Sequence, residues 1–129
     1  MSMQTVAHSQ YARAAAVTAS PAEVVRMAYE RIIAACDRAT LAHLTPGGSW
    51  LQIFHDETVR AQAILMELAS VLAVGHPNPA VDEMAKSLDG IYAFAAQQLA
   101  TANIEKSAEP LRAVRRMIDG LRDAWVTAS

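Results

Sequence analysis

The chain has 129 residues, a net charge of −2, and a composition that is 53% hydrophobic but only 5% aromatic. This length favours one domain with a core of useful size, and the charge excludes the strongly basic face that nucleic-acid binding requires. Because alanine is abundant and alternating β-type segments are absent, we expect an all-α fold, an antiparallel up-down four-helix bundle.

Residues 1–19 are polar and carry only isolated apolar positions, so we expect a flexible N-terminal arm that docks in part. Residues 20–129 are expected to form the bundle. Polar side chains interrupt any apolar stretch near the start, and no run approaches the roughly 18 residues of a membrane span. The single cysteine, Cys36, excludes an internal disulfide and suits a reducing compartment. These features predict a cytoplasmic protein without stable membrane insertion.

Two helices are expected in the first half of the bundle. Ser20, Pro21 and Glu23 form a capping box with proline at the first helical position, which predicts a helix over about residues 21–43. The break at residues 45–49 contains one proline and two glycines. A second helix is expected over about residues 50–74, with a buried stripe that runs from Phe54 to Leu72.

The second half predicts two more helices. Asn78 is a good N-cap and Pro79 suits the first helical position, so the third helix is expected over about residues 79–102. A polar joint at residues 103–107 should precede the fourth helix. That helix tolerates Pro110 in its first turn and carries an apolar stripe that ends at Trp125.

The residues that could carry chemistry do not form a recognisable site. No glutamate has a histidine three residues later, so the helical di-iron pattern is missing. His55, Asp56 and Glu57 are neighbours along the chain, and neighbours on a helix do not face one another. Cys36 has no nearby activating base. We therefore expect no enzyme activity, no cofactor and no metal site.

Methionine and aromatic positions leave two interpretations open. Met27, Met66, Met84 and Met117 either fill the core or belong to an adaptable surface that accepts helical segments. Ile91, Tyr92 and Phe94 are too close together to share one face of a helix, so at least one should leave the core. This surplus of apolar side chains favours a binding groove.

Several sequence pieces occur in the order typical of one family. Tyr11 precedes the first helix, TASP occupies residues 18–21, and Val24, Met27 and Tyr29 follow in an apolar stretch. Further pieces are Ala61-Gln62 with Glu67-Leu68, then Leu88, Ile91, Tyr92 and Leu99, then Ala102-Asn103-Ile104, and finally LRDAW at residues 121–125. With these pieces the chain resembles the flagellin-specific export chaperones, the FliS family. The segment at residues 72–79, the loop at 45–50 and Phe94 depart from the family pattern and indicate a divergent member.

The resemblance implies a cytoplasmic helical bundle that binds the disordered C-terminal segment of flagellin. Such a chaperone prevents premature polymerisation and supports delivery to the flagellar type III secretion apparatus, with the export gate as a second expected contact. The arm around Tyr11 would cover a groove while that groove is empty. The expected partner-binding residues are Tyr11, Tyr92, Leu99, Ile104, Met117, Leu121 and Trp125, with a structural role for Leu121 and Trp125 as the alternative. The alternative function is a helical adaptor or regulator of another secretion system.

Overall fold

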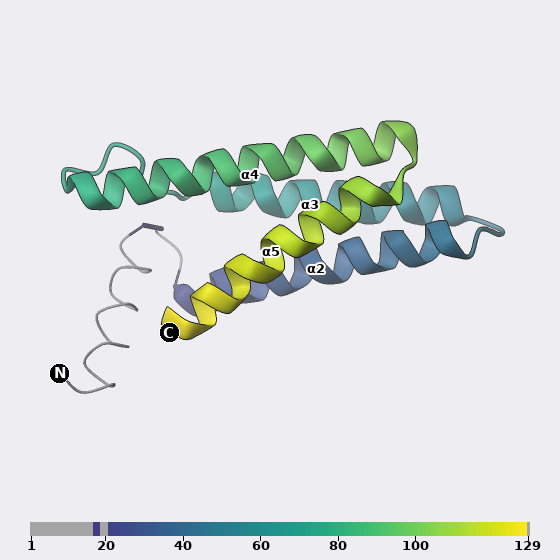
Figure 1. Cartoon of the computed structure of the whole chain (residues 1–129), viewed down its shortest axis with the longest axis horizontal. Helices are drawn as coiled ribbons and strands as arrows, with labels where there is room; N and C mark the ends of the chain where they lie inside the picture. The colour runs from purple at the N-terminus through teal and green to yellow at the C-terminus, as the bar shows by residue number, and fades with distance from the viewer. Residues whose placement is uncertain (1–16, 19–20, 129) are drawn as a thin grey trace.

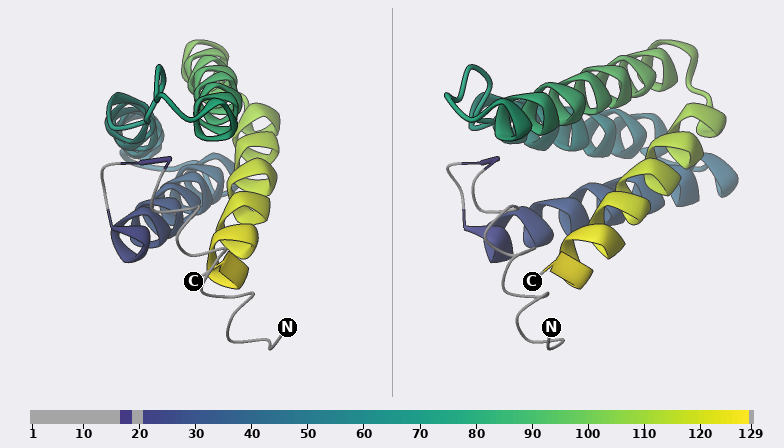
Figure 2. Two further views of the ribbon diagram at one scale, coloured as in Figure 1. Left: turned by 90° about the vertical axis from the view of Figure 1, so that its left-hand side faces the viewer. Right: turned by 60° about the vertical axis from the view of Figure 1, so that its left-hand side comes forward.

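A computed structural model describes residues 17–18 and 21–128. It contains four helices, α2 (Ala22–Leu44), α3 (Trp50–Ser70), α4 (Pro79–Glu105) and α5 (Ala108–Ala128). Figure 1 shows that each helix runs roughly antiparallel to the one before it. Helices α2, α3 and α4 lie nearly parallel in axis, whereas α5 crosses them obliquely and diverges from α4 (Figures 1 and 2). The expected all-α four-helix bundle is confirmed.

Small side chains line much of the core and let the helices approach closely. Ala35 and Ala39 of α2, Ala61 of α3 and Ala95 and Ala102 of α4 are fully buried. Larger apolar residues fill the space between these positions, and tight packing of this kind accounts for a core with few aromatics. The largest of them are Tyr29, Ile32, Phe54, Leu65, Leu99, Leu111 and Ile118.

The sequence predicted N-terminal caps for two helices, α2 and α4, and the structure differs from the prediction only at α2. Asn78 accepts a hydrogen bond from the Ala80 N–H at 3.0 Å, with Pro79 at the first helical position, as predicted. Pro21 flanks α2 and is not its first residue, which corrects the expected start by one position. The Glu23 carboxylate pairs with Arg26, and the Ser20 part of the expected capping box lies outside the described residues.

Helix α3 ends at Ser70, four residues before the predicted end. Leu72 forms an antiparallel bridge with Thr18, and the Ala73 N–H donates to the Val17 carbonyl at 2.9 Å. Val17 is itself buried in the core. Residues 72–73 therefore pair with the segment before α2 and do not continue the helix. Helical periodicity alone could not reveal this long-range pairing.

Helix α4 runs three residues further than predicted, and only Lys106 and Ser107 separate it from α5. Lys106 ends the helix in the left-handed conformation, with φ of 50°, a position that usually takes glycine or asparagine. Its ammonium group donates to Asn103 Oδ1 at 2.5 Å and lies 5.3 Å from the centre of the Phe54 ring. These contacts stabilise a turn that is shorter than the joint predicted at residues 103–107.

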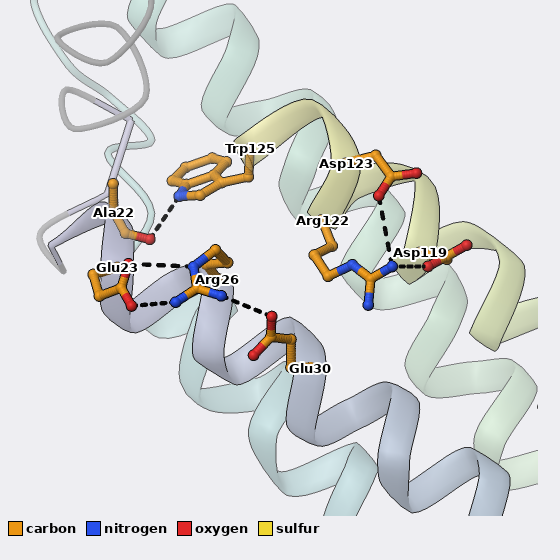
Figure 3. Close-up of polar contacts among 8 residues, drawn as sticks. All are labelled: Ala22, Glu23, Arg26, Glu30, Asp119, Arg122, Asp123 and Trp125. Carbon is orange, nitrogen blue, oxygen red and sulfur yellow. Dashed lines mark hydrogen bonds and ion pairs between the residues drawn. The ribbon is translucent and has the colours of Figure 1, made fainter. Parts of the chain in front are cut away.

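Trp125 fastens the end of α5 to the start of α2 (Figure 3). Its indole Nε1–H donates to the Ala22 carbonyl at 2.8 Å, and its ring meets Tyr29 edge-on with centroids 6.0 Å apart. The side chain is buried. Beside it, Arg26 pairs with Glu23 and Glu30 on the exposed side of α2. Trp125 thus has the structural role that the sequence suggested as the alternative to partner binding.

Truncation of this tryptophan should destabilise the bundle strongly. We expect Trp125→Ala to lower the free energy of unfolding by about 3–5 kcal/mol, the range for loss of a buried aromatic. Trp125→Phe keeps most of the ring and should lose about 1 kcal/mol with the hydrogen bond. Urea unfolding followed by far-UV circular dichroism measures both. The exposed Leu44→Ala is the control, and a Trp125→Ala loss no larger than this control would contradict the assignment.

Candidate partner-binding surface

The residues expected to bind a partner divide into buried and exposed positions. Tyr92 is only 2% exposed and Leu99 is completely buried, so the expectation that both are exposed apolar positions is wrong. Both lie on the core side of α4 because they continue the stripe of Leu88 and Ala95. Tyr11 lies outside the described residues.

Tyr92 belongs to a buried polar pair in the core. Its hydroxyl lies 2.5 Å from the hydroxyl of Tyr29, and the two rings are tilted with centroids 6.4 Å apart. Burial raises the pKa of both hydroxyls above the ordinary tyrosine value. Each hydroxyl therefore stays protonated and one donates a hydrogen bond to the other, which is how two polar groups can be tolerated among apolar helices.

The tyrosine pair should show coupling and sensitivity to alkali. Tyr29→Phe and Tyr92→Phe each leave one buried hydroxyl unpaired and should lose about 1–2 kcal/mol, whereas the double variant should lose less than the sum. Because both native pKa values are raised, their stabilisation is complete below the unfolded-chain value of about 10 and declines above it. Urea unfolding at pH 8 and at higher pH checks this, and strictly additive losses would contradict it.

The other three predicted positions remain accessible. Ile104 is 83% exposed near the end of α4 and points away from the core. Met117 and Leu121 are half-buried and pack against the core from α5. These three residues stay candidates for partner contact, whereas Trp125 holds the helices together.

The structure adds exposed apolar residues that the sequence did not single out as contacts. Gln62 of α3 donates to the Ala96 carbonyl at 3.4 Å, which marks the side of α4 that faces α3. The opposite edge of the buried stripe of α4 faces α5, and it carries Met84, Ile91 and Phe94. Phe94 is 51% exposed, which confirms that one of the three bulky neighbours leaves the core.

Helix α5 presents matching side chains to α4. Arg115 donates to Asp37 of α2 at 3.0 Å, which marks the α2-facing side of α5. Met117 and Leu121 lie across the core stripe from Arg115, so they lie toward α4. We call Met84, Ile91, Phe94, Met117 and Leu121 the α4–α5 face. The two helices diverge from their joint (Figure 2), and Met84 and Phe94 are exposed while Met117 and Leu121 are half-buried.

A second apolar surface follows the contact between α2 and α3. A hollow of about 320 Å³ lies between Val24 and Ala28 of α2 on one side and Ile64 of α3 and Val71, just beyond α3, on the other. Another of about 270 Å³ lies near the opposite ends of these helices, beside Trp50. The sequence did not predict this surface, because helical spacing places Val24 and Ile64 on apolar stripes and such stripes are expected to be buried.

Most of the methionines singled out in the sequence lie on the surface of the bundle and not in its core. Met27, Met66 and Met84 are exposed, and Met117 is half-buried. Core filling is therefore the wrong interpretation for the first three. Flexible, polarisable side chains at exposed helical positions suit surfaces that adapt to apolar segments.

The remaining polar and titratable groups do not assemble a reactive centre in the described part of the chain. Burial raises the pKa of the Cys36 thiol to about 12, and the adjacent Asp37 carboxylate adds to that shift. A thiol with this pKa is protonated and unreactive near neutral pH. Among the described residues, no group of three His, Cys, Asp or Glu side chains could hold a metal ion.

None of the described helices combines the length and the apolar character needed to cross a membrane.

The fold and these surfaces define a helical-bundle protein whose prominent exposed features are apolar helix sides. The model of the family described as Flagellar protein FliS matches residues 3–129. The chain is also 29% identical over 120 residues to the flagellar secretion chaperone FliS of Campylobacter jejuni subsp. jejuni serotype O:6 (strain 81116 / NCTC 11828), covering 93% of this chain and 88% of that relative. The chain therefore belongs to the FliS family, as the ordered sequence pieces from Tyr11 to Trp125 indicated.

Proposed function

We propose that this protein is a cytoplasmic export chaperone that binds the disordered C-terminal segment of flagellin. Binding would prevent premature polymerisation and support delivery to the flagellar type III secretion apparatus, with the export gate as a further contact. The match to the FliS family over nearly the whole chain carries this proposal. The name of the Campylobacter relative, a flagellar secretion chaperone, supports it.

The α4–α5 face suits the ordering of a disordered segment. A segment that folds on binding loses conformational entropy, so it needs a long apolar contact to bind usefully. An amphipathic helix can supply anchors at i, i+3, i+4 and i+7 to such a face. Phe94 and Met84 offer exposed apolar area on α4, and Met117 and Leu121 offer it on α5. Ile104 lies near the joint but on a different side of α4 from Ile91 and Phe94, so it stays a separate candidate contact.

A charge on the α4–α5 face should weaken flagellin binding. We expect Phe94→Asp to raise the Kd for the isolated C-terminal segment of flagellin by about tenfold or more, because a carboxylate would be desolvated under the guest. Isothermal titration calorimetry with the full chain measures the change. Leu44→Asp is the matched control, since it places the same charge at an exposed leucine at the end of α2.

The same titration tests the function as a whole. No binding of the flagellin segment by the unaltered protein at tens of micromolar would sink the proposal and favour an adaptor of another secretion system. Binding that Phe94→Asp leaves intact would keep the function but move the site to another surface. Circular dichroism of each variant shows whether the bundle is still folded.

The segment before α2 is proposed to act as an internal competitor for the flagellin site. Deletion of residues 1–16 keeps Val17 and Thr18, which pack against the core and the loop after α3. We expect the truncated protein to bind more of an apolar-surface dye and to bind the flagellin segment more tightly, by roughly threefold to tenfold. Unchanged dye binding together with unchanged affinity would remove the competitor role.

A further inference from the structure

The groove between α2 and α3 has features that the proposed flagellin site does not use. On α2 its wall follows Val24, Arg31 and Arg38, which are spaced by seven residues and therefore share one face of the helix. On α3 the opposing wall includes Glu57, Arg60 and Ile64. We call this surface the α2–α3 groove and define it by the residues Val24, Ala28, Arg31, Arg38, Leu41, Ile53, Glu57, Arg60, Ile64 and Val71.

The α2–α3 groove and the α4–α5 face lie on different sides of the bundle. The helices pack in a ring in which α2 contacts α3 and α5, while α4 contacts α3 and α5. The left panel of Figure 2 shows α2 and α3 together on one side, with α4 and α5 on the other. A helix bound in the α2–α3 groove would therefore leave the α4–α5 face open.

The two ends of the α2–α3 groove are apolar and hollowed. At one end Val24 and Ala28 meet Ile64 and Val71 around a hollow of about 320 Å³. At the other end Leu41, Ala42, Trp50 and Ile53 surround a hollow of about 270 Å³. The 17 positions from Val24 to Leu41 correspond to about 26 Å along the helix axis, at 1.5 Å per residue. A guest helix of about 18 residues would reach both hollows.

The middle of the groove is positively charged. Arg38 lies 3.0 Å from Glu57 across the groove, and Arg60 lies 3.9 Å from the same carboxylate. Arg31 is exposed and, among the described residues, has no ion-pair partner. Two guanidinium groups therefore share the Glu57 carboxylate, and Arg31, on the same face of α2 as Arg38, adds a third positive charge to this side of a chain whose net charge is −2. Glu67 is an acidic residue at the rim of the first hollow.

Glu57 cannot neutralise this centre fully. Its side chain is 12% exposed, and its Oε2 atom, although 3.0 Å from Arg38 Nε, makes no hydrogen bond of good geometry. One carboxylate shared by two arginines leaves donor groups of Arg38 and Arg60 directed to solvent, because each guanidinium carries five N–H donors. A guest that brings further carboxylates would pair with these donors and with Arg31.

We propose that the α2–α3 groove binds a second partner, an amphipathic helix with apolar residues at both ends and acidic residues in its middle. The apolar ends occupy the two hollows, and the central Asp or Glu side chains pair with Arg31 and Arg60. A partner with basic residues at the centre would meet like charges and be rejected, which is how such a surface selects among amphipathic helices. This proposal stands independently of flagellin binding at the α4–α5 face.

Two synthetic helical peptides test the charge pattern. Both have about 18 residues with the same leucine anchors at each end; one carries glutamates at the centre and the other carries lysines. Fluorescence anisotropy with the full-length protein should give a Kd for the glutamate peptide at least about tenfold lower than for the lysine peptide. Equal affinities, or no binding of either peptide at hundreds of micromolar, would overturn the proposal.

Charge reversal on the protein assigns the peptide to this groove. The double variant Arg31→Glu/Arg60→Glu should lose the preference for the glutamate peptide or reverse it. The matched control Arg112→Glu/Arg116→Glu changes the net charge equally but lies on α5, where both arginines are exposed near Glu109. An effect of the control as large as that of the groove variant would show non-specific attraction and contradict the site.

Competition separates this site from the flagellin site. With the glutamate peptide bound and labelled, an excess of the flagellin C-terminal segment should leave the anisotropy signal in place, and the Phe94→Asp variant should bind the peptide normally. Displacement of the peptide by the flagellin segment would show that flagellin itself occupies the groove and would overturn the assignment to a second partner. Failure of the flagellin segment to bind at all would sink the proposed function but not this inference.

Discussion

Tyr29 joins three of the four helices at the end of the bundle where α4 and α5 move apart. Its hydroxyl contacts Tyr92 of α4, and its ring receives the edge of Trp125 from α5. Figure 1 shows α4 and α5 diverging from their joint toward this end, so this side chain helps to hold both helices against α2. A single aromatic residue can therefore hold two helices against α2 without pressing them together, and their facing apolar sides remain uncovered.

Apolar residues outside the core give this bundle its surfaces. The core is filled largely by alanine and by a few large residues, so the chain has apolar side chains to spare on α2, α3 and α4. Some of them lie at the α4–α5 face and at the α2–α3 groove. The two surfaces differ in charge, since the α4–α5 face is apolar throughout whereas the α2–α3 groove has arginines between apolar ends. This difference gives each surface its own selectivity for helical partners.

Sequence patterns predicted the four helices, the Asn78 cap and the departure of one bulky residue of α4 from the core, since these depend on local spacing. They did not predict which of Ile91, Tyr92 and Phe94 would leave it, because the exact phase of α4 is set by its packing against α3. Nor did they predict the early end of α3, which depends on the distant Val17 and Thr18. The α2–α3 groove was missed because helical periodicity identifies an apolar stripe but not how deeply a neighbouring helix covers its edges.

Helix α5 is long and is joined to α4 through only two residues, Lys106 and Ser107. Its 21 residues give it a length of roughly 30 Å. A rotation of roughly 10° at that pivot would move the far tip by roughly 5 Å, about one helical turn. Near that tip lies Trp125, whose contacts include the hydrogen bond to the Ala22 carbonyl and the edge-on ring contact with Tyr29. Because these contacts lie at the end of α5 farthest from the joint, they constrain the angle between α4 and α5 more than the same contacts near the joint would.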